Sequence, residues 1–177
     1  WSKGEYFLIL NQDVILKPNY IEDLIKYLDG HNDVSSVQGK ILTWDFIKTQ
    51  NYAKDLSRRL HTHEFIDTCG LQMQKNRRVV NIGQGVEDIG QFEKPLAIFG
   101  VAGTAPIYRR KSLAVVTYNE ELFDENFFAY KEDVDLAWRL RLVGWSSFCV
   151  PSAIAYHDRS LKEPGSFWQL IKIRRHW

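Results

Sequence analysis

The sequence is poor in the features that mark several specialised classes of protein. It has only two cysteines, Cys69 and Cys149, and their separation fits neither a metal site nor a disulfide framework, which is typical of a reducing compartment. No apolar run of about 20 residues appears, so no membrane-spanning helix is predicted. Acidic and basic residues nearly balance, at a net charge of +1, which argues against a general nucleic-acid-binding surface.

What is present indicates one folded unit. Of the 177 residues 45% are hydrophobic, which is enough for one sizeable core. No internal repeat is visible. We therefore expect a single domain over residues 1–177, and the pattern described next places it in the α/β class.

Three carboxylates, Glu132, Asp133 and Asp135, crowd the start of an expected amphipathic helix. Asp133 falls near its first turn, where unpaired backbone N–H groups and the helix dipole favour an ionised carboxylate. An aromatic run at residues 127–130 would shield it from water, as a general base for a hydroxyl group requires. The helix is predicted by apolar residues at helical spacing, namely Leu136, Leu140 and Val143.

A purely structural reading of these carboxylates stays open. Glu132 and Asp133 would then only cap the helix, and Asp135 would only pair with Arg139 one turn later. Acidic residues are common at helix starts, so the cluster by itself does not decide between the two readings.

A second acidic element follows a short apolar run at residues 5–10, which has the length of a strand. The run ends at Asn11 and Asp13, and Pro18 then opens a helix predicted to reach Gly30. A carboxylate just past a buried strand lies at the edge of an α/β sheet where ligands bind. Oxygen ligands of this kind suit a hard divalent cation that also holds phosphate oxygens.

The order of these segments resembles the family 2 glycosyltransferases, and within them the bacterial rhamnosyltransferase-like branch. The resemblance covers nearly the whole chain. It is carried by Leu-Asn-Gln-Asp-Val at residues 10–14, Gly-Val-Ala-Gly-Thr-Ala at 100–105 followed by Tyr-Arg-Arg at 108–110, Phe-Asp-Glu-Asn-Phe-Phe at 123–128, Glu-Asp-Val-Asp at 132–135 with Trp138 and Arg139, Gly-Trp at 144–145, and the segment 151–157.

The resemblance implies a GT-A fold, a nucleotide-binding mixed sheet flanked by helices. Asp13 would be the main ligand of Mg²⁺ or Mn²⁺, and His157, at the end of a predicted strand over residues 151–156, would complete the metal shell. Asn11 stands where many relatives have Asp, which makes metal dependence less secure. A histidine at a strand end can also be a hydrogen-bonded structural residue, and that alternative stays open.

The same resemblance implies the reaction. Asp133, with Glu132 beside it, would deprotonate the acceptor hydroxyl, which displaces a nucleoside diphosphate from the sugar and inverts its anomeric configuration. The expected partners are a nucleotide-sugar donor, with rhamnose preferred as the sugar, and a glycan or lipid-linked oligosaccharide acceptor. Contacts to donor or acceptor would come from six residues: Asn11, Gly103, Asp135, Trp138, Arg139 and Asp67.

The middle of the chain is expected to shape the acceptor side. Residues 66–74 and 79–83 are predicted as two strands joined by a polar turn, and Asp67 lies on the first of them. The glycine-rich residues 100–105 lack the lysine of a phosphate-binding loop, so we interpret them as backbone that approaches a sugar closely, with a bulged strand as the alternative.

Both ends affect the expected behaviour. No βα units precede the first strand, so we expect an internal fragment that lacks its nucleotide-binding units, is inactive by itself and exposes a sheet border. Residues 166–177 mix aromatic, apolar and basic side chains and are predicted as a C-terminal helix, with peripheral contact to an anionic membrane as the alternative. The expected location is the cytoplasm or the inner face of the membrane.

Two rival functions remain at this point. A binding module that has lost catalysis would keep the fold but not the reaction, although the presence of both Asp13 and Asp133 argues against it. A nucleotidyltransferase shares an α/β core and a metal but attacks phosphorus, and it would need a basic triphosphate loop upstream of this chain.

Overall fold

The computed structural model describes residues 3–44, 64–118, 121–127 and 131–158. Their centre is a seven-stranded sheet in which β1, β8, β3, β9 and β2 follow one another, while β4 pairs with β3 and β7 pairs with β9. The strands are β1 (Tyr6–Leu8), β2 (Val14–Leu16), β3 (Val34–Trp44), β4 (Ile66–Thr68), β7 (Leu96–Ile98), β8 (Ile107–Arg109) and β9 (Ser146–Asp158). A separate hairpin joins β5 (Leu71–Met73) to β6 (Val79–Asn81).

The sheet is mixed. β3 and β9 run parallel, from Val34 opposite Ser146 to Trp44 opposite Asp158, whereas the other pairings are antiparallel. β3 is buried along most of its length because elements cover both of its faces. A parallel pair buried on both faces is what α/β proteins build, so the predicted α/β class is confirmed.

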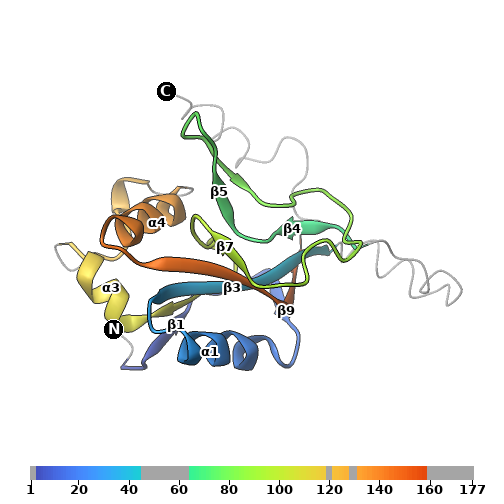
Figure 1. Ribbon diagram of the computed structural model, residues 1–177, viewed down its shortest axis with the longest axis horizontal. Helices are drawn as coiled ribbons and strands as arrows, with labels where there is room; N and C mark the ends of the chain where they lie inside the picture. The colour runs from blue at the N-terminus through green and yellow to red at the C-terminus, as the bar shows by residue number, and fades with distance from the viewer. Residues whose placement is uncertain (1–2, 45–63, 119–120, 128–130, 159–177) are drawn as a thin grey trace, which may run out of the picture.

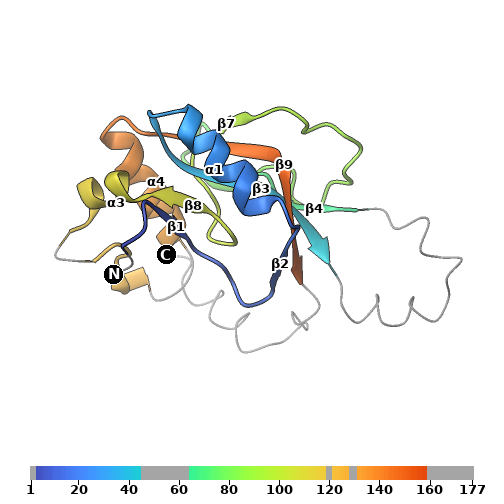
Figure 2. The ribbon, with the colours of Figure 1, turned by 90° about the horizontal axis from the view of Figure 1, so that it is seen from below.

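Helices cover the two faces of the sheet separately, as Figures 1 and 2 show. Helix α1 (Tyr20–Gly30) lies on one face, where its buried stripe packs against β3 and β9. Helices α3 (Arg110–Val116) and α4 (Glu132–Leu142) lie on the other face, over a second apolar cluster, and a single 3-10 turn, η2 (Glu125–Phe127), precedes α4.

The structure confirms several of the predicted helices and strands and adds strands that the sequence analysis did not predict. The helix after Pro18 and the helix at Glu132 are both present, although Val143 is 49% exposed rather than part of the buried face, because it caps α4. The strand predicted at residues 66–74 is split, since Gly70 has a φ of 109°, a value that favours glycine, and turns the chain from β4 into β5. The predicted hairpin with the second strand is present as β5 and β6. Strands β2, β3, β7 and β8 were not predicted.

Both cysteines are free thiols in the core. Cys69 follows β4 and Cys149 lies on β9. The interaction between the two thiols lowers the pKa of Cys69 and raises the pKa of Cys149. They belong to the apolar cluster that α4 covers, as their apolar sequence context indicated.

Among the described residues, no helix is both long and apolar enough to cross a membrane. The predicted C-terminal helix at residues 166–177 lies outside the described residues.

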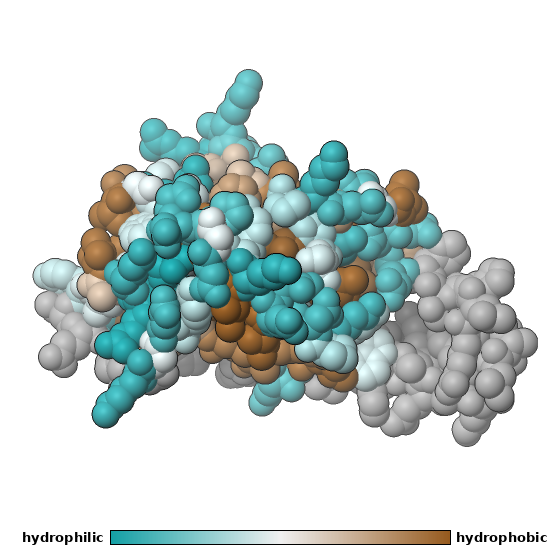
Figure 3. Space-filling model, turned by 60° about the horizontal axis from the view of Figure 1, so that its bottom comes forward, coloured by the Kyte–Doolittle hydropathy of each residue, from teal (hydrophilic) through white to brown (hydrophobic). Residues whose placement is uncertain are grey.

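One border of the sheet is apolar. Within the described residues, β1 ends the strand order, and Leu8 and Leu10 on it and just after it are 36% and 46% exposed. Figure 3 shows a largely hydrophilic face on which apolar side chains gather along the lower part. Within the described residues β1 thus has one unpaired side, and the expected exposure of a sheet border and tendency to associate stay predictions.

Tyr20 joins α1 to the centre of the sheet, and this predicts a measurable loss of stability. Its buried hydroxyl donates to the Ala105 carbonyl at 2.8 Å and accepts the Gly39 N–H at 3.1 Å. Tyr20→Phe leaves both backbone groups unpaired, so the free energy of unfolding should fall by about 2 kcal/mol. Urea titration measures it. Tyr27→Phe on the same helix is the matched control and should change stability by less than about 0.5 kcal/mol; equal losses would contradict the assignment.

Candidate active site

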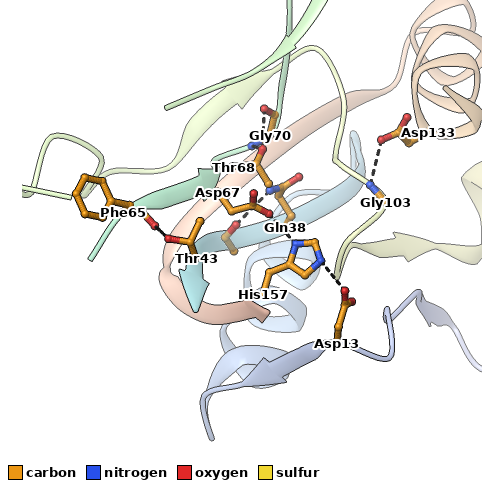
Figure 4. Close-up of polar contacts among 11 residues, drawn as sticks. Asp13, Gln38, Thr43, Phe65, Asp67, Thr68, Gly70, Gly103, Asp133 and His157 are labelled. Carbon is orange, nitrogen blue, oxygen red and sulfur yellow. Dashed lines mark hydrogen bonds and ion pairs between the residues drawn. The ribbon is translucent and has the colours of Figure 1, made fainter. Parts of the chain in front are cut away.

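Two strands bring Asp13 and His157 together from opposite ends of the chain. β2 pairs antiparallel with the end of β9, so that Val14 stands opposite His157, and the Asp158 N–H donates to the Asp13 carbonyl at 2.8 Å. This register places Asp13 Oδ2 at 3.2 Å from His157 Nε2 (Figure 4). The two residues that the motif resemblance assigned to a metal are therefore neighbours.

Asp67 holds the other side of the imidazole. Its Oδ2 lies 2.7 Å from His157 Nδ1, and both side chains are almost fully buried. A carboxylate at this distance accepts the Nδ1–H, and Nε2 is the ring nitrogen that faces the oxygen of Asp13. Two electron-rich atoms at 3.2 Å need a proton or a cation between them. Asp67 thus lies behind His157, at 3% exposure, and the expected contact of Asp67 with an acceptor stays a prediction.

Asp133 lies at the second position of α4 and is held by two N–H groups. Its Oδ1 accepts the Val134 N–H at 2.8 Å. Its Oδ2 accepts the Gly103 N–H at 3.2 Å, as Figure 4 shows. The first turn of a helix favours a negative charge, so the position suits an ionised carboxylate. The aromatic residues 128–130, which we expected to shield it, lie outside the described residues.

Glu132 differs from its neighbour in its surroundings. Burial raises the pKa of the Glu132 carboxyl group, and the charge of Asp133 raises it further. Its Oε2 is buried and has no hydrogen-bond partner within the described part of the chain. Burial also raises the pKa of Tyr108, which senses the charges of both carboxylates. The pair therefore consists of one well-held carboxylate and one that resists ionisation.

Residues 102–106 join two carboxylate clusters through the main chain. One cluster is Asp13 and Asp67 around His157, and the other is Glu132 and Asp133 at the start of α4. The Asn11 N–H donates to the Thr104 carbonyl and the Ile9 N–H to the Pro106 carbonyl, each at 3.0 Å. Gly103, next to Thr104, holds Asp133. The segment leading to Asp13 and the start of α4 therefore share one loop, which links the predicted metal ligands to the predicted base.

The donor set fits a divalent cation that has few protein ligands. Asp13 supplies a carboxylate and His157 a nitrogen whose orientation Asp67 fixes, an arrangement common behind metal ligands. Within the described ranges, no group of three or more His, Cys, Asp or Glu side chains could hold a metal ion. A cation here would complete its shell with water and phosphate oxygens, as Mg²⁺ commonly does.

The remaining predicted residues lie around α4, and one of them has mainly structural partners. Arg139 pairs with Asp135 at 2.8 Å and also donates to the Val116 and Leu122 carbonyls. Trp138 is 40% exposed and meets Phe99 edge to face. The Asp135 and Arg139 pair therefore matches the structural reading of the cluster, and any ligand contact of these residues stays a prediction. Asn11 is exposed beside the site.

Sequence reasoning missed Gln38. This residue lies on β3, is 1% exposed, and accepts the Ala102 N–H through Oε1 at 2.6 Å. The available signal was an amide in a stretch of strand that also contains Val37, Ile41 and Leu42, because a buried amide needs a partner. Only the fold shows that its partner is the loop that carries Gly103.

The fold is that of the GT-A glycosyltransferases, as the motifs predicted. A crystal structure of GalNAc-T7 with UDP, GalNAc and Mn²⁺ superposes with a TM-score of 0.60 over 90% of this chain and 28% of that one, at 12% identity. This likeness concerns the fold. No family model matches the chain.

Sequence similarity points to a narrower group. The chain is 53% identical over 74 residues to the N-acetylglucosaminyl-diphospho-decaprenol L-rhamnosyltransferase of two strains of Mycobacterium tuberculosis. The matched part covers 42% of this chain and 22% of the relative, so the chain spans about a fifth of that protein's length. The resemblance to rhamnosyltransferase-like glycosyltransferases is confirmed.

Two glycines near the site should respond differently to a methyl group. A Cβ at Gly103 would meet Glu132 and Asp133 only at 3.7 Å or more, whereas a Cβ at Gly100 would lie 2.2 Å from the Cβ of Ala137 on α4. Gly103→Ala should therefore change the free energy of unfolding by less than about 0.5 kcal/mol, and Gly100→Ala should lower it by about 2 kcal/mol. Thermal unfolding tests both, and a larger loss for Gly103→Ala would contradict the open space at Gly103.

Proposed function

We propose that this chain is the metal- and acceptor-side part of an inverting glycosyltransferase domain. The donor is a nucleoside-diphosphate sugar, and the acceptor is a hydroxyl group of a glycan or a lipid-linked oligosaccharide. The observation that carries the proposal is the loop 102–106, which joins the segment leading to Asp13 to the helix start that holds Asp133. Metal ligands and a general base are needed on opposite sides of one reacting sugar.

The base of the proposed reaction is Asp133. It takes the proton of the acceptor hydroxyl as that oxygen bonds to the anomeric carbon and the bond from this carbon to the diphosphate oxygen breaks. The pair of electrons leaves with the nucleoside diphosphate, and attack from the opposite face inverts the configuration. The N–H groups of Gly103 and Val134 orient the carboxylate for this step. Glu132 contributes a second carboxyl group beside it.

Asp13 and His157 would hold a divalent cation, Mg²⁺ or Mn²⁺, on the other side. The cation supplies charge that stabilises the departing diphosphate. Asp67 keeps His157 in the tautomer whose Nε2 is free to act as a ligand. The Mn²⁺ and UDP in the crystal structure of the GalNAc-T7 neighbour support this assignment.

The relatives favour a particular pair of substrates. The Mycobacterium tuberculosis protein is named a rhamnosyltransferase that acts on N-acetylglucosaminyl-diphospho-decaprenol. We extend to this chain a rhamnosyl donor and a lipid-linked acceptor of that kind. The chain spans about a fifth of that relative, so the complete gene product is the protein to assay. Membrane contact through residues 166–177 stays a prediction, because they lie outside the described residues.

Removing the base should stop turnover without stopping donor binding. In the complete gene product, Asp133→Asn should lower kcat by about 10²–10⁴-fold and leave the donor affinity within about threefold, because only the proton transfer is lost. The assay follows nucleoside diphosphate release from a panel of nucleotide sugars with Mg²⁺ or Mn²⁺. Glu125→Gln, an exposed carboxylate before α4, is the matched control and should keep its activity.

Each other outcome has a definite meaning. Equal turnover by Asp133→Asn and the parent would remove Asp133 from the role of base. Tight donor binding by the parent without turnover of any sugar would favour a binding module over an enzyme. Pyrophosphate release from a nucleoside triphosphate would favour a nucleotidyltransferase.

The carboxylate behind His157 should matter for the metal. Asp67→Asn no longer fixes the Nδ1–H form, so the affinity for Mn²⁺ should fall by about 10–100-fold. Electron paramagnetic resonance of Mn²⁺ titrated with protein measures the free ion directly. Glu64→Gln is the control, since Glu64 bonds Tyr156, the residue before His157, and its loss removes the same charge. Equal affinities in the two variants would argue against a metal at His157.

A further inference from the structure

One face of β3 carries a ladder of buried polar side chains. Ser36, Gln38 and Lys40 alternate with residues that face α1, so they share the opposite face of the strand. Each is at most 6% exposed. Each also ties a different segment to the strand: Ser36 bonds Ser147 at 2.8 Å, Gln38 bonds Ala102 at 2.6 Å, and Lys40 pairs with Asp88 at 2.7 Å.

Gln38 is the member of this ladder that reaches the loop of the proposed site. Its Oε1 accepts the Ala102 N–H, while its Nε2 makes only a longer contact, 3.3 Å, to the neighbouring Gly39 carbonyl. The short bond therefore uses the acceptor end of the amide. An apolar side chain would fill the same space in a buried strand, so packing by itself does not call for glutamine here.

The next N–H along the loop is the one that holds Asp133. The Ala102 N–H points to Gln38 on β3, and the Gly103 N–H points to Asp133 Oδ2 on α4. Figure 4 shows these two residues on different sides of the loop. The Ala102 N–H belongs to the peptide between residues 101 and 102, and the Gly103 N–H belongs to the next peptide. The two peptide planes meet at the Ala102 Cα, so once the first plane is fixed only the φ and ψ of Ala102 set the direction of the second.

The Gly103 bond also decides how the Asp133 carboxylate is turned. Oδ1 is held by the Val134 N–H of its own helix, and Oδ2 is held from across the site by Gly103. With only the bond to Val134, the carboxylate is still held by α4 but is free to turn relative to the loop 102–106. A displacement of about 1 Å is enough to cost on the order of 10² in rate.

We infer that Gln38 is a positioning residue for the general base: it fixes the peptide between Val101 and Ala102, and thereby the start of the next peptide, whose Gly103 N–H orients Asp133. This rests on the proposed role of Asp133. Gln38 itself touches neither substrate nor metal. Its effect should therefore fall on kcat and on the Gly103 amide, and much less on the binding of the donor.

Four variants of the complete gene product test this. Gln38→Met keeps the length of the side chain and removes the acceptor, and Gln38→Asn keeps the amide but shortens its reach by one methylene. Gln38→Glu keeps an acceptor at the same reach. Ser36→Ala loses a buried hydrogen bond on the same face of β3 but has no contact with the loop, so it controls for general weakening of the strand.

We expect kcat to fall while the KM for the donor stays nearly unchanged. Gln38→Met and Gln38→Asn should lower kcat by about 10–100-fold with the donor KM within about threefold, and Gln38→Glu should restore kcat to within about fivefold of the parent. Ser36→Ala should match the parent. Loss of kcat in Gln38→Glu equal to that in Gln38→Met, or an unchanged kcat in Gln38→Met, would overturn the inference.

A second readout does not depend on turnover. Amide hydrogen exchange at Gly103 should quicken by about tenfold in Gln38→Met and Gln38→Asn but not in Ser36→Ala, because the loop loses its tie to β3. Unchanged exchange at Gly103 would also overturn the inference. If the parent shows no turnover with any nucleotide sugar, the proposed function fails, while the exchange result still decides whether Gln38 holds the loop.

Discussion

The parallel pairing of β3 with β9 is the constraint on which the rest of the structure depends. It extends from Val34 to Trp44, with register shifts after Val34 and after Gly39, and places Thr43 opposite His157. β4 then adds to the far side of β3 and brings Asp67 to the imidazole, while β2 adds to the far side of β9 and brings Asp13. Asp13, His157 and the Asp67 carboxylate behind it are distant in sequence and meet because these strands flank the same pair.

The second half of the site depends on a loop rather than on a strand. Residues 102–106 are tied to β3 by Gln38, to α1 by Tyr20 and to the segment before Asp13 by Asn11. These ties leave the Gly103 N–H directed at α4. The sheet thus positions the cluster of Asp13, Asp67 and His157. The loop 102–106, fixed at several points, positions Asp133 through the Gly103 N–H at 3.2 Å.

The sequence predicted the parts of this site that carry local signals. Pro18 and the apolar spacing after it gave α1, and the acidic start with Leu136 and Leu140 gave α4. β3 was missed because Ser36, Gln38 and Lys40 interrupt its apolar pattern, and those side chains are buried only through partners far away in sequence. The partnership of Asp67 with His157 depends likewise on strand order, which no local pattern encodes.

The contacts that join the two clusters are made mainly by the main chain, and this affects how the site can diversify. Asn11 and Thr104 meet through backbone atoms, and Gly103 reaches Asp133 through its N–H. Backbone groups are the same in every residue except proline, so substitutions at such positions can alter the lining while the spacing between the clusters persists. An arrangement of this kind can be inherited across proteins whose sequences have drifted far apart, because the side chains that line it can change while the backbone contacts that space the two clusters are kept.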